Sequence, residues 1–431
     1  MSTVEPARAA RPHAAVTFAP LLRAALGDEL PVRFEFWDGS GLGPRTGPGT
    51  VRVRSADAVR RMMWSPGELG LGRAYVAGDL DLRGDIFTVL RALQSAAARD
   101  AQLGPRAAWA ALRVAGRLGV LGPPPRPPRE EARPHGWRHS KRRDAEVISH
   151  HYDVGNDFYG LVLGPSLTYS CARYTDDTVG LADAQAAKHE LISRKLGLHE
   201  RAGSRLLDVG CGWGSMALHA AAEHGASVVG VTISRAQADL ARKRVAEAGL
   251  TGRVEIRVQD YRDLAGETFD AVSSIGMFEH VGAKAMAGYF RTLRALLRPG
   301  GRLLNHAISS VGGSRIGRRT FIGRYVFPDG ELVDIGEVVL AMERAGFEVR
   351  DVESLREHYE RTLRDWVANL DANWPQAVRL VGEARARIWR LYMAGSALGF
   401  ADGGIGVHQV LAVVPASDGD SAMPATRRDW G

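Results

Sequence analysis

One short segment, residues 208–214, combines residue types and spacing that suit the binding of a small ligand. It reads Asp208-Val209-Gly210-Cys211-Gly212-Trp213-Gly214. The glycines allow the backbone to approach a ligand closely, and the start of a following helix offers free backbone amides. Glycine-rich turns between strand and helix also occur in dinucleotide-binding proteins. The turn by itself therefore indicates either a nucleotide-type site or a tight turn without function.

Two details favour S-adenosylmethionine over a dinucleotide as the ligand. An acid, Asp208, stands next to the glycines, as expected where the ligand is a cationic amino acid rather than a pyrophosphate. The next apolar run ends in Thr232-Ile233-Ser234, without the acid that the ribose of NAD requires. We therefore predict an S-adenosylmethionine site at this turn.

The elements around the turn alternate between strand and helix. Strands are predicted at residues 205–209, 227–231, 254–258, 269–275 and 302–308, the last after a turn at 297–301, and helices at 215–224 and 235–248. This alternation predicts an α/β fold, a doubly wound, mostly parallel sheet of the Rossmann-like class I methyltransferase type. Ligands of such sheets bind beyond the carboxyl ends of the strands.

Three regions are expected along the chain. Residues 1–121 form a smaller mixed α/β domain, with strands at 32–37 and 51–54 and a helix at 85–98. Residues 122–144 form a linker rich in proline and arginine, either a solvated tether or a basic contact with anionic lipid headgroups. Residues 145–431 form the methyltransferase domain, with a disordered tail at 415–431.

Further motifs make the chain resemble one family. They are residues 151–158 (His-Tyr-Asp-Val-Gly-Asn-Asp-Phe), Tyr169-Ser170-Cys171, residues 276–282 (Gly-Met-Phe-Glu-His-Val-Gly), residues 321–328 and residues 358–363. With these motifs the chain resembles the cyclopropane-fatty-acid synthases. That family includes mycolic-acid cyclopropane synthases and actinobacterial enzymes that place a methylene or methyl branch on oleoyl chains. The resemblance covers residues 145–415 strongly, and residues 67–75 resemble the extra domain of phospholipid-acting members more weakly.

The resemblance implies a role for individual positions. The residues implied to contact S-adenosylmethionine are Tyr152, Tyr169, Ser170, Asp208, Gly210, Gly212, Gly214, Thr232, Gln237, Asp260 and Tyr261. In the family a bicarbonate ion acts as the base, and the positions that match its holders are Cys171, Glu279, His306, Ile308 (through its backbone) and Tyr359. By itself Cys171 is also typical of a small buried residue, His306 of a core histidine and Tyr359 of a packing ring. Glu279 follows a predicted strand end, which favours a functional role without the resemblance.

The implied reaction explains these residue types. An isolated alkene is a weak nucleophile, so it must be held against the sulfonium methyl in a dry channel. Methyl transfer leaves a carbocation, which aromatic faces such as Tyr359, Phe278 or Tyr325 stabilise. A base then removes a proton. Loss from the new methyl closes a cyclopropane, whereas loss from that methyl after a hydride shift onto the neighbouring cationic carbon gives a methylene branch, which a separate reductase could saturate.

Composition narrows the setting of this reaction. The 431 residues carry 56 Lys and Arg against 49 Asp and Glu, a net charge of +7, which suits an anionic surface. Two cysteines without paired spacing predict neither a disulfide framework nor a cysteine-based zinc site, and no metal site is predicted. With no long apolar run and no signal peptide, we expect a cytoplasmic protein, peripherally bound to the inner face of the membrane. A basic stretch at residues 311–326 (Arg315, Arg318, Arg319 and Arg324) is either a solvated loop or a headgroup contact.

Two other functions remain open from the sequence. One is an O- or N-methyltransferase of a small metabolite, which would share the turn but not need Cys171, Glu279, His306 and Tyr359. The other is a non-catalytic lipid-surface protein. A nucleic acid partner is not expected, because residues 276–279 lack the Asn/Asp-Pro-Pro-aromatic segment that grips a flipped base. By resemblance, a homodimer is expected.

Overall fold

The computed structural model describes residues 13–99, 105–118, 122–132, 154–264, 266–313, 317, 320–428 and 430. The chain divides into two compact units. The first is Met1–Glu131 with Arg387–Leu391, and the second is Ala132–Ala386 with Tyr392–Gly431. Each is described by itself. The domain boundaries expected at residues 121 and 144 fall in stretches outside the described residues, so they stay predictions.

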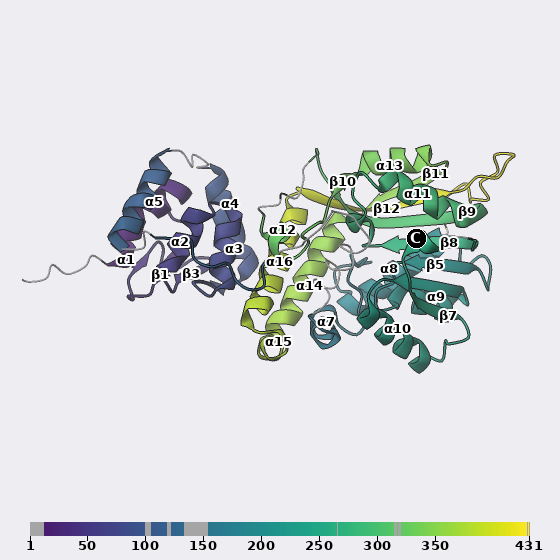
Figure 1. Ribbon diagram of the computed structural model, residues 1–431, viewed down its shortest axis with the longest axis horizontal. Helices are drawn as coiled ribbons and strands as arrows, with labels where there is room; N and C mark the ends of the chain where they lie inside the picture. Colours follow the sequence, from purple (N-terminus) through teal and green to yellow (C-terminus); the bar gives the residue numbers. More distant parts are fainter. Residues whose placement is uncertain are drawn as a thin grey trace, which may run out of the picture. The chain divides into compact units, whose positions relative to one another are not determined.

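The first unit is a mixed α/β structure around a four-stranded sheet in the order β2-β1-β3-β4 (Figure 1). Its strands are β1 (Arg33–Phe36), β2 (Gly41–Leu42), β3 (Gly49–Val53) and β4 (Leu80–Gly84), and its helices are α1 (Ala14–Leu26), α2 (Asp57–Trp64), α3 (Glu68–Val76), α4 (Ile86–Arg99) and α5 (Pro105–Leu118). Alternate residues of β1 and β3 are buried, among them Phe34, Phe36, Val51 and Val53. This alternation places one sheet face in a core and agrees with the predicted strands.

Part of the predicted linker is bound to this unit. Arg60 donates to the carbonyl of Pro123 (2.7 Å), and Trp64 donates to that of Gly122 (3.1 Å). Glu131, which is buried, forms a paired salt bridge with Arg73 (2.7 and 2.8 Å). A solvated tether is therefore wrong for residues 122–131. Residues 133–144 lie outside the described residues.

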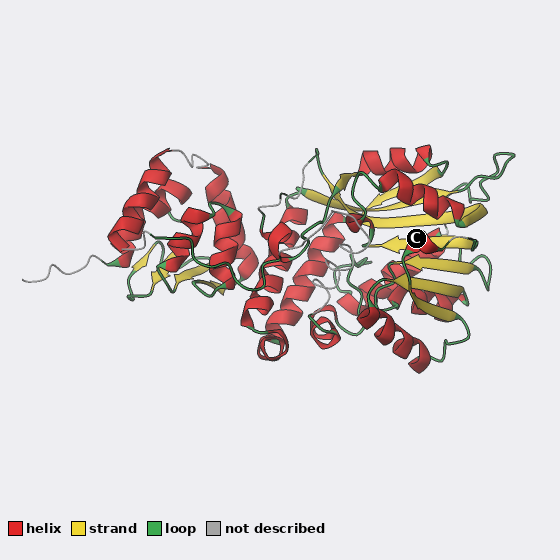
Figure 2. Ribbon diagram, viewed as in Figure 1, coloured by secondary structure: helices red, strands yellow, loops and turns green. Residues whose placement is uncertain are grey.

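The second unit is built on an eight-stranded sheet. The path runs β11-β12-β9-β8-β5-β6-β7, with β10 paired to β9 (Figures 1 and 2). The strands are β5 (Arg205–Val209), β6 (Ser227–Thr232), β7 (Val254–Val258), β8 (Phe269–Ile275), β9 (Leu297–Ser310), β10 (Val333–Asp334), β11 (Glu348–Ser354) and β12 (Ile405–Val413). Strands β5 to β9 are parallel, whereas β12 is antiparallel to both of its neighbours. This confirms the predicted doubly wound, mostly parallel sheet.

Helices cover both faces of this sheet. On one face α8 (Leu181–Lys195), α9 (Ser215–His224) and α10 (Arg235–Glu247) pack in a cluster that contains Leu206 of β5. On the other face α11 (Met286–Ala295) and α13 (Ile335–Arg344) pack in a cluster that contains Leu207. Neighbouring residues of one strand point to opposite faces, so a strand buried on both sides needs an apolar run, as β5 has.

Further helices stand beside the sheet. They are α7 (Asn156–Leu163), α12 (Phe321–Tyr325), α14 (Arg356–Ala372), α15 (Trp374–Val381) and α16 (Glu383–Ala401), with 3₁₀ turns η1 (Tyr261–Asp263) and η2 (Phe278–His280). Helix α14 packs against α7 and buries Trp366 completely. Among the described residues, no helix has both the length and the apolar character that crossing a bilayer requires.

Two stretches differ from the sequence expectations. The turn expected at 297–301 belongs to β9, because Gly300 and Gly301 exchange hydrogen bonds with Val414 (2.7 and 2.9 Å) and so continue the ladder. The chain end, expected to be disordered from residue 415, is packed in its described part. Arg427 pairs with Asp351 (2.7 Å), and Trp430 is buried.

Candidate active site

The glycine-rich turn joins β5 to α9. The amides of Gly210 and Cys211 both donate to the carbonyl of Val231, at 2.9 and 3.0 Å, which fixes the turn to the end of β6. Gly210 has a φ of +74°, and a Cβ there would lie 2.9 Å from the side chain of Met277. Only glycine therefore fits this position. The turn leaves the first amides of α9 at the carboxyl edge of the sheet, where an anionic group would bind.

A cavity opens at this edge, with an empty volume of about 1270 Å³ that includes solvent at its mouth. Nine residues predicted to contact the cofactor line it: Tyr169, Ser170, Asp208, Gly210, Gly212, Thr232, Gln237, Asp260 and Tyr261. Gly214 does not; it caps α9, and a Cβ there would meet Ala241 at 3.3 Å. Tyr152 lies outside the described residues. The predicted contacts that the structure describes thus gather, with this exception, around one cavity.

The acid of the turn is buried and only partly hydrogen-bonded. Oδ1 of Asp208 accepts from Ser273 (2.8 Å), while the buried Oδ2 has no partner among the described residues. Burial raises the pKa of Asp208 to about 6, against the lowering effects of Ser273 and Lys188. A buried carboxylate oxygen without a partner is costly unless a ligand supplies a donor. The ammonium group of an amino acid would be such a donor.

Lys188 is a cavity residue that sequence reasoning missed. It is fully buried on α8, and its Nζ donates to Oγ of Ser170 (3.0 Å). Burial lowers its pKa to about 7, opposed in part by the nearby Asp208 carboxylate. A signal existed in the sequence: Lys188 falls four residues before Ile192 on the apolar stripe of the helix, where a lysine is unusual.

Two hydrogen-bonded turns present the other predicted cofactor residues. After β6, the hydroxyl of Thr232 donates to the side chain of Gln237 (3.0 Å), whose backbone amide donates to Ser234 (3.3 Å). After β7, Asp260 accepts from the amide of Arg262 (2.9 Å) and caps η1. Both turns therefore follow parallel strands on the same side of β5, β6 directly beside it and β7 one strand further out, at the carboxyl edge that the fold predicts for ligands.

Glu279 in η2 and His306 on β9 each contain a buried side-chain atom that can form a hydrogen bond. Oε1 of Glu279 accepts from the amide of Ile308 (2.8 Å), whereas its buried Oε2 has no partner among the described residues. Burial raises the pKa of Glu279 to about 7, against its backbone hydrogen bonds. Nδ1 of His306 contacts Nε2 of Gln409 (3.2 Å), its Nε2 has no described partner, and burial lowers its pKa.

Cys171 and Tyr359 meet at one backbone carbonyl. Sγ of Cys171 lies 3.5 Å from the carbonyl oxygen of Leu355, which also accepts from the amide of Tyr359 (3.0 Å). The amide of Leu355 donates to Val407, which is paired across the sheet with Ile308. Burial raises the pKa of the Cys171 thiol, which is therefore neutral. These contacts connect four of the predicted catalytic residues, Cys171, Glu279, Ile308 and Tyr359, and His306 lies two residues before Ile308 on β9. None of the five is among the described residues that line the cavity.

Aromatic ring contacts connect Tyr169, a predicted cofactor residue, with Tyr359, a predicted catalytic residue. The Trp366 ring lies 5.3 Å from that of Tyr169 and 6.0 Å from that of Tyr359. The hydroxyl of Tyr169 also donates to that of Tyr392 (3.1 Å), a contact that the sequence did not indicate. Phe278, expected beside a carbocation, instead packs in the sheet core against Phe290 (5.5 Å), because it begins η2 facing α11.

This combination defines a class I methyltransferase: a doubly wound sheet, a glycine-rich turn after its first parallel strand, and a cavity with a buried acid. The family model described as mycolic acid cyclopropane synthetase matches residues 139–410. The chain belongs to this family and is an S-adenosylmethionine-dependent enzyme.

Individual relatives agree. A probable fatty acid methyltransferase of Mycobacterium tuberculosis is 42% identical over 424 residues, covering 93% of this chain and 94% of the relative. The cyclopropane-fatty-acyl-phospholipid synthase of Escherichia coli is 35% identical over 368 residues, covering 84% and 87%. The solved structure of the mycolic acid cyclopropane synthase CmaA1 complexed with SAH and CTAB is 34% identical, with a TM-score of 0.59, covering 62% and 97%.

Proposed function

We propose that this enzyme transfers a methyl group from S-adenosylmethionine to the cis double bond of an oleoyl-type phospholipid acyl chain. Two observations carry the proposal. Hydrogen bonds and strand pairing link Glu279, through Ile308, to the segment where Cys171 and Tyr359 contact Leu355. The ring of Trp366 lies close to those of both Tyr359 and Tyr169, and Tyr169 lines the cofactor cavity. A methyltransferase acting on oxygen or nitrogen needs a base near its substrate but does not need aromatic rings around it. An alkene substrate needs both the base and the rings, because its carbocation must be stabilised and then deprotonated.

On the cofactor side, Asp208 holds the ammonium group of the methionine moiety through its unpartnered Oδ2. The amides at the start of α9 hold the carboxylate. Asp260 and Tyr261 flank the nucleoside. Lys188 donates to Ser170 and so positions the segment that carries Tyr169 and Cys171.

On the acceptor side, Tyr359, Phe400 and Trp366 supply aromatic faces. The Tyr359 ring lies 4.7 Å from Phe400 and perpendicular to Trp366, so a cation formed nearby meets ring faces without a nucleophile that would capture it. Such a site also excludes water, which would otherwise trap the cation as an alcohol.

Proton removal is assigned to the group around Glu279. A bicarbonate ion fits here, because Oε2 of Glu279 and Nε2 of His306 are both buried and unpartnered among the described residues. Cys171, Glu279, His306, Ile308 and Tyr359 would hold it, and it would supply the base. Glu279, with a pKa of about 7, can accept the proton and release it to solvent at neutral pH.

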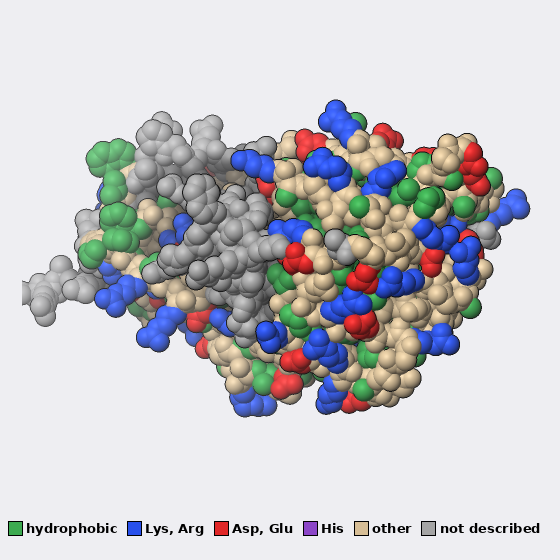
Figure 3. Space-filling view, turned by 45° about the vertical axis from the view of Figure 1, so that its right-hand side comes forward, with side chains coloured by type: hydrophobic (Ala, Val, Ile, Leu, Met, Phe, Trp, Pro, Cys, Tyr) green, Lys and Arg blue, Asp and Glu red, His purple; other side chains and the backbone are tan. Residues whose placement is uncertain are grey.

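We favour a methylene-branched product over a cyclopropane. A separate reductase would then saturate the methylene group. Access to the acyl chain would come from peripheral binding of the enzyme, as a homodimer, to the inner face of an anionic membrane. On the face that Figure 3 shows, Lys and Arg side chains alternate with Asp and Glu instead of gathering in one patch. We assign the membrane contact to the basic residues of segment 133–144 and to Arg315, Arg318 and Arg319 because of their charge in the sequence. These residues lie outside the described residues.

The test is lipid mass spectrometry on a bacterium that expresses this chain, fed oleate and isotope-labelled methionine. Esterified oleoyl chains should gain one labelled carbon, and catalytic hydrogenation under mild conditions should distinguish an exocyclic methylene from a ring. A folded protein that binds S-adenosylmethionine but labels no acyl chain would contradict the proposal and favour a small-metabolite methyltransferase.

A further inference from the structure

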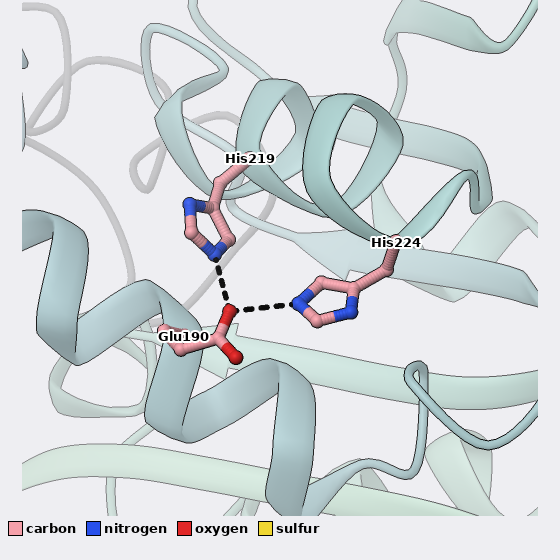
Figure 4. A group of neighbouring side chains, drawn as sticks. All are labelled: Glu190, His219 and His224. Atoms are coloured by element: carbon pink, nitrogen blue, oxygen red, sulfur yellow. Dashed lines mark hydrogen bonds and ion pairs between the residues drawn. The ribbon is translucent and has the colours of Figure 1, made fainter.

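Three potential metal ligands converge on the side of the second unit formed by α8 and α9 (Figure 4). They are Glu190 of α8 and His219 and His224 of α9. One ligand atom from each lies within 4.8 Å of the others. None of the three lines the cofactor cavity or takes part in the chemistry described above. From this cluster we infer a divalent metal site, with Zn²⁺ as the ion that its ligands suit best.

The geometry of the cluster is close to that of a bound ion. Nε2 of His219 lies 3.2 Å and Nε2 of His224 lies 2.8 Å from the same oxygen, Oε2 of Glu190. Tetrahedral zinc with bonds of about 2.0–2.2 Å separates its ligand atoms by about 3.3 Å. Both separations from Glu190 therefore need only small side-chain shifts to admit an ion. Figure 4 shows both imidazole rings turned toward this one carboxylate.

The surroundings hold the ligands in place. Nε of Arg194 donates to Oε1 of Glu190 (2.6 Å), which orients the carboxylate and leaves Oε2 directed at the histidines. Hydrogen bonds of this kind to the second oxygen of a ligand are typical of metal sites. His224 is also the last residue of α9, and the carboxyl end of a helix favours a cation.

The ligand set indicates which ion binds and what it does. Two imidazoles and a carboxylate favour zinc or a similar transition ion over magnesium or calcium, and water would take the fourth position. The ion would join α8 to α9. Helix α8 carries Lys188 and His189 in the cavity wall, and α9 begins at the glycine-rich turn. It would therefore stabilise the wall of the cofactor cavity without touching the cofactor.

The test uses the untagged full-length protein, stripped with EDTA and titrated calorimetrically with ZnCl₂. We expect one equivalent of Zn²⁺ per chain, bound at micromolar concentration or below, and a rise in melting temperature that EDTA reverses. His224→Gln and Glu190→Gln should each weaken this binding more than about tenfold. The matched control is His199→Gln, an exposed histidine just beyond α8, which should bind as the parent does.

A second measurement does not depend on the variants. Co²⁺ added to the parent protein should give the intense visible absorption of a tetrahedral site, and Zn²⁺ should displace it. Zinc binding that is equal in parent and His224→Gln, or a parent that shows neither a stoichiometric zinc isotherm nor the cobalt spectrum, would overturn the inference. Circular dichroism and S-adenosylhomocysteine affinity report whether each variant is folded.

Discussion

The cofactor side and the acceptor side of the site each contain one buried carboxyl group, and the two differ in what surrounds it. Burial raises the pKa of Asp208 to about 6, while the Ser273 hydroxyl and Lys188 lower it. Burial likewise raises the pKa of Glu279 to about 7, while its backbone hydrogen bonds lower it. The two pKa values rise by a similar amount from their ordinary values of 3.8 and 4.5, so the two carboxyl groups differ mainly in their partners.

This difference separates two tasks. At neutral pH Asp208 is mostly charged, as a residue that holds a cationic ligand must be. Glu279 is present in both protonation states in comparable amounts, as suits a group that accepts and releases a proton in each catalytic cycle. The comparison teaches that location and partners distinguish the two carboxyl groups: Asp208 lines the cofactor cavity beside Lys188, whereas Glu279 accepts from the backbone amide of Ile308.

The largest effect is expected from Glu279→Gln. The amide keeps the size of the side chain but cannot take a proton, so kcat should fall about 10²–10⁴-fold while the Kd of S-adenosylmethionine stays within about twofold. Product formation by mass spectrometry and binding by calorimetry check this, with Glu343→Gln, exposed on α13, as the control. Unchanged turnover would remove Glu279 from the mechanism.

The complementary change, Asp208→Asn, should reverse this pattern. Loss of a charge-assisted hydrogen bond of about 1.5–3 kcal/mol should raise the Kd of S-adenosylmethionine by about 10–100-fold. The remaining activity at saturating cofactor should approach that of the parent. Calorimetry measures the affinity, and Asp239→Asn, exposed on α10, is the control. If kcat fell as sharply as in Glu279→Gln, the two carboxyl groups would not have separate tasks.

The sequence predicts these two sides unequally well. The bounds of β5, α9, β7 and β8 agree with those expected, since each is encoded by a local apolar run or by the glycines beside it. The same local encoding explains why the cofactor residues gather as predicted. The acceptor side is assembled from β8, β9, α14 and the segment before α8, and only the family resemblance brought these distant residues together.

What the sequence did not predict depends on packing between distant segments. Lys188 became a site residue because α8 turns it toward Ser170, and Tyr392 because α16 places it against Tyr169. The chain end was expected to be disordered, but Arg427 forms an ion pair with Asp351. Asp351 also pairs with the buried Lys195 (2.9 Å). No local sequence pattern indicates which distant charged residue will form the ion pair with such a side chain.

A smaller effect tests the role of Lys188 directly. Lys188→Met keeps the length of the side chain but removes its charge, so the pKa of Asp208 should rise above about 6. More Asp208 is then protonated at pH 7, and S-adenosylmethionine should bind about three- to tenfold more weakly there, with recovery toward pH 9. Calorimetry across pH, with the exposed Lys243→Met as control, measures this. A loss that does not depend on pH would show that Lys188 acts through Ser170 alone.

The smallest effect is expected at Cys171, which is buried and whose thiol contacts the backbone carbonyl of Leu355. Because its pKa is raised, the thiol stays neutral at working pH and offers only a weak hydrogen-bond donor, so Cys171→Ser should change kcat by no more than about threefold. The parent should gain activity as pH rises through about 7, since the basic carboxylate form of Glu279 then increases, and should level off above that pH. Cys171→Ser should follow the same curve. A displaced midpoint in this variant would mean that the thiol and Glu279 titrate as a coupled pair, and that the acceptor side, like the cofactor side, tunes its carboxyl group through a neighbouring ionisable residue.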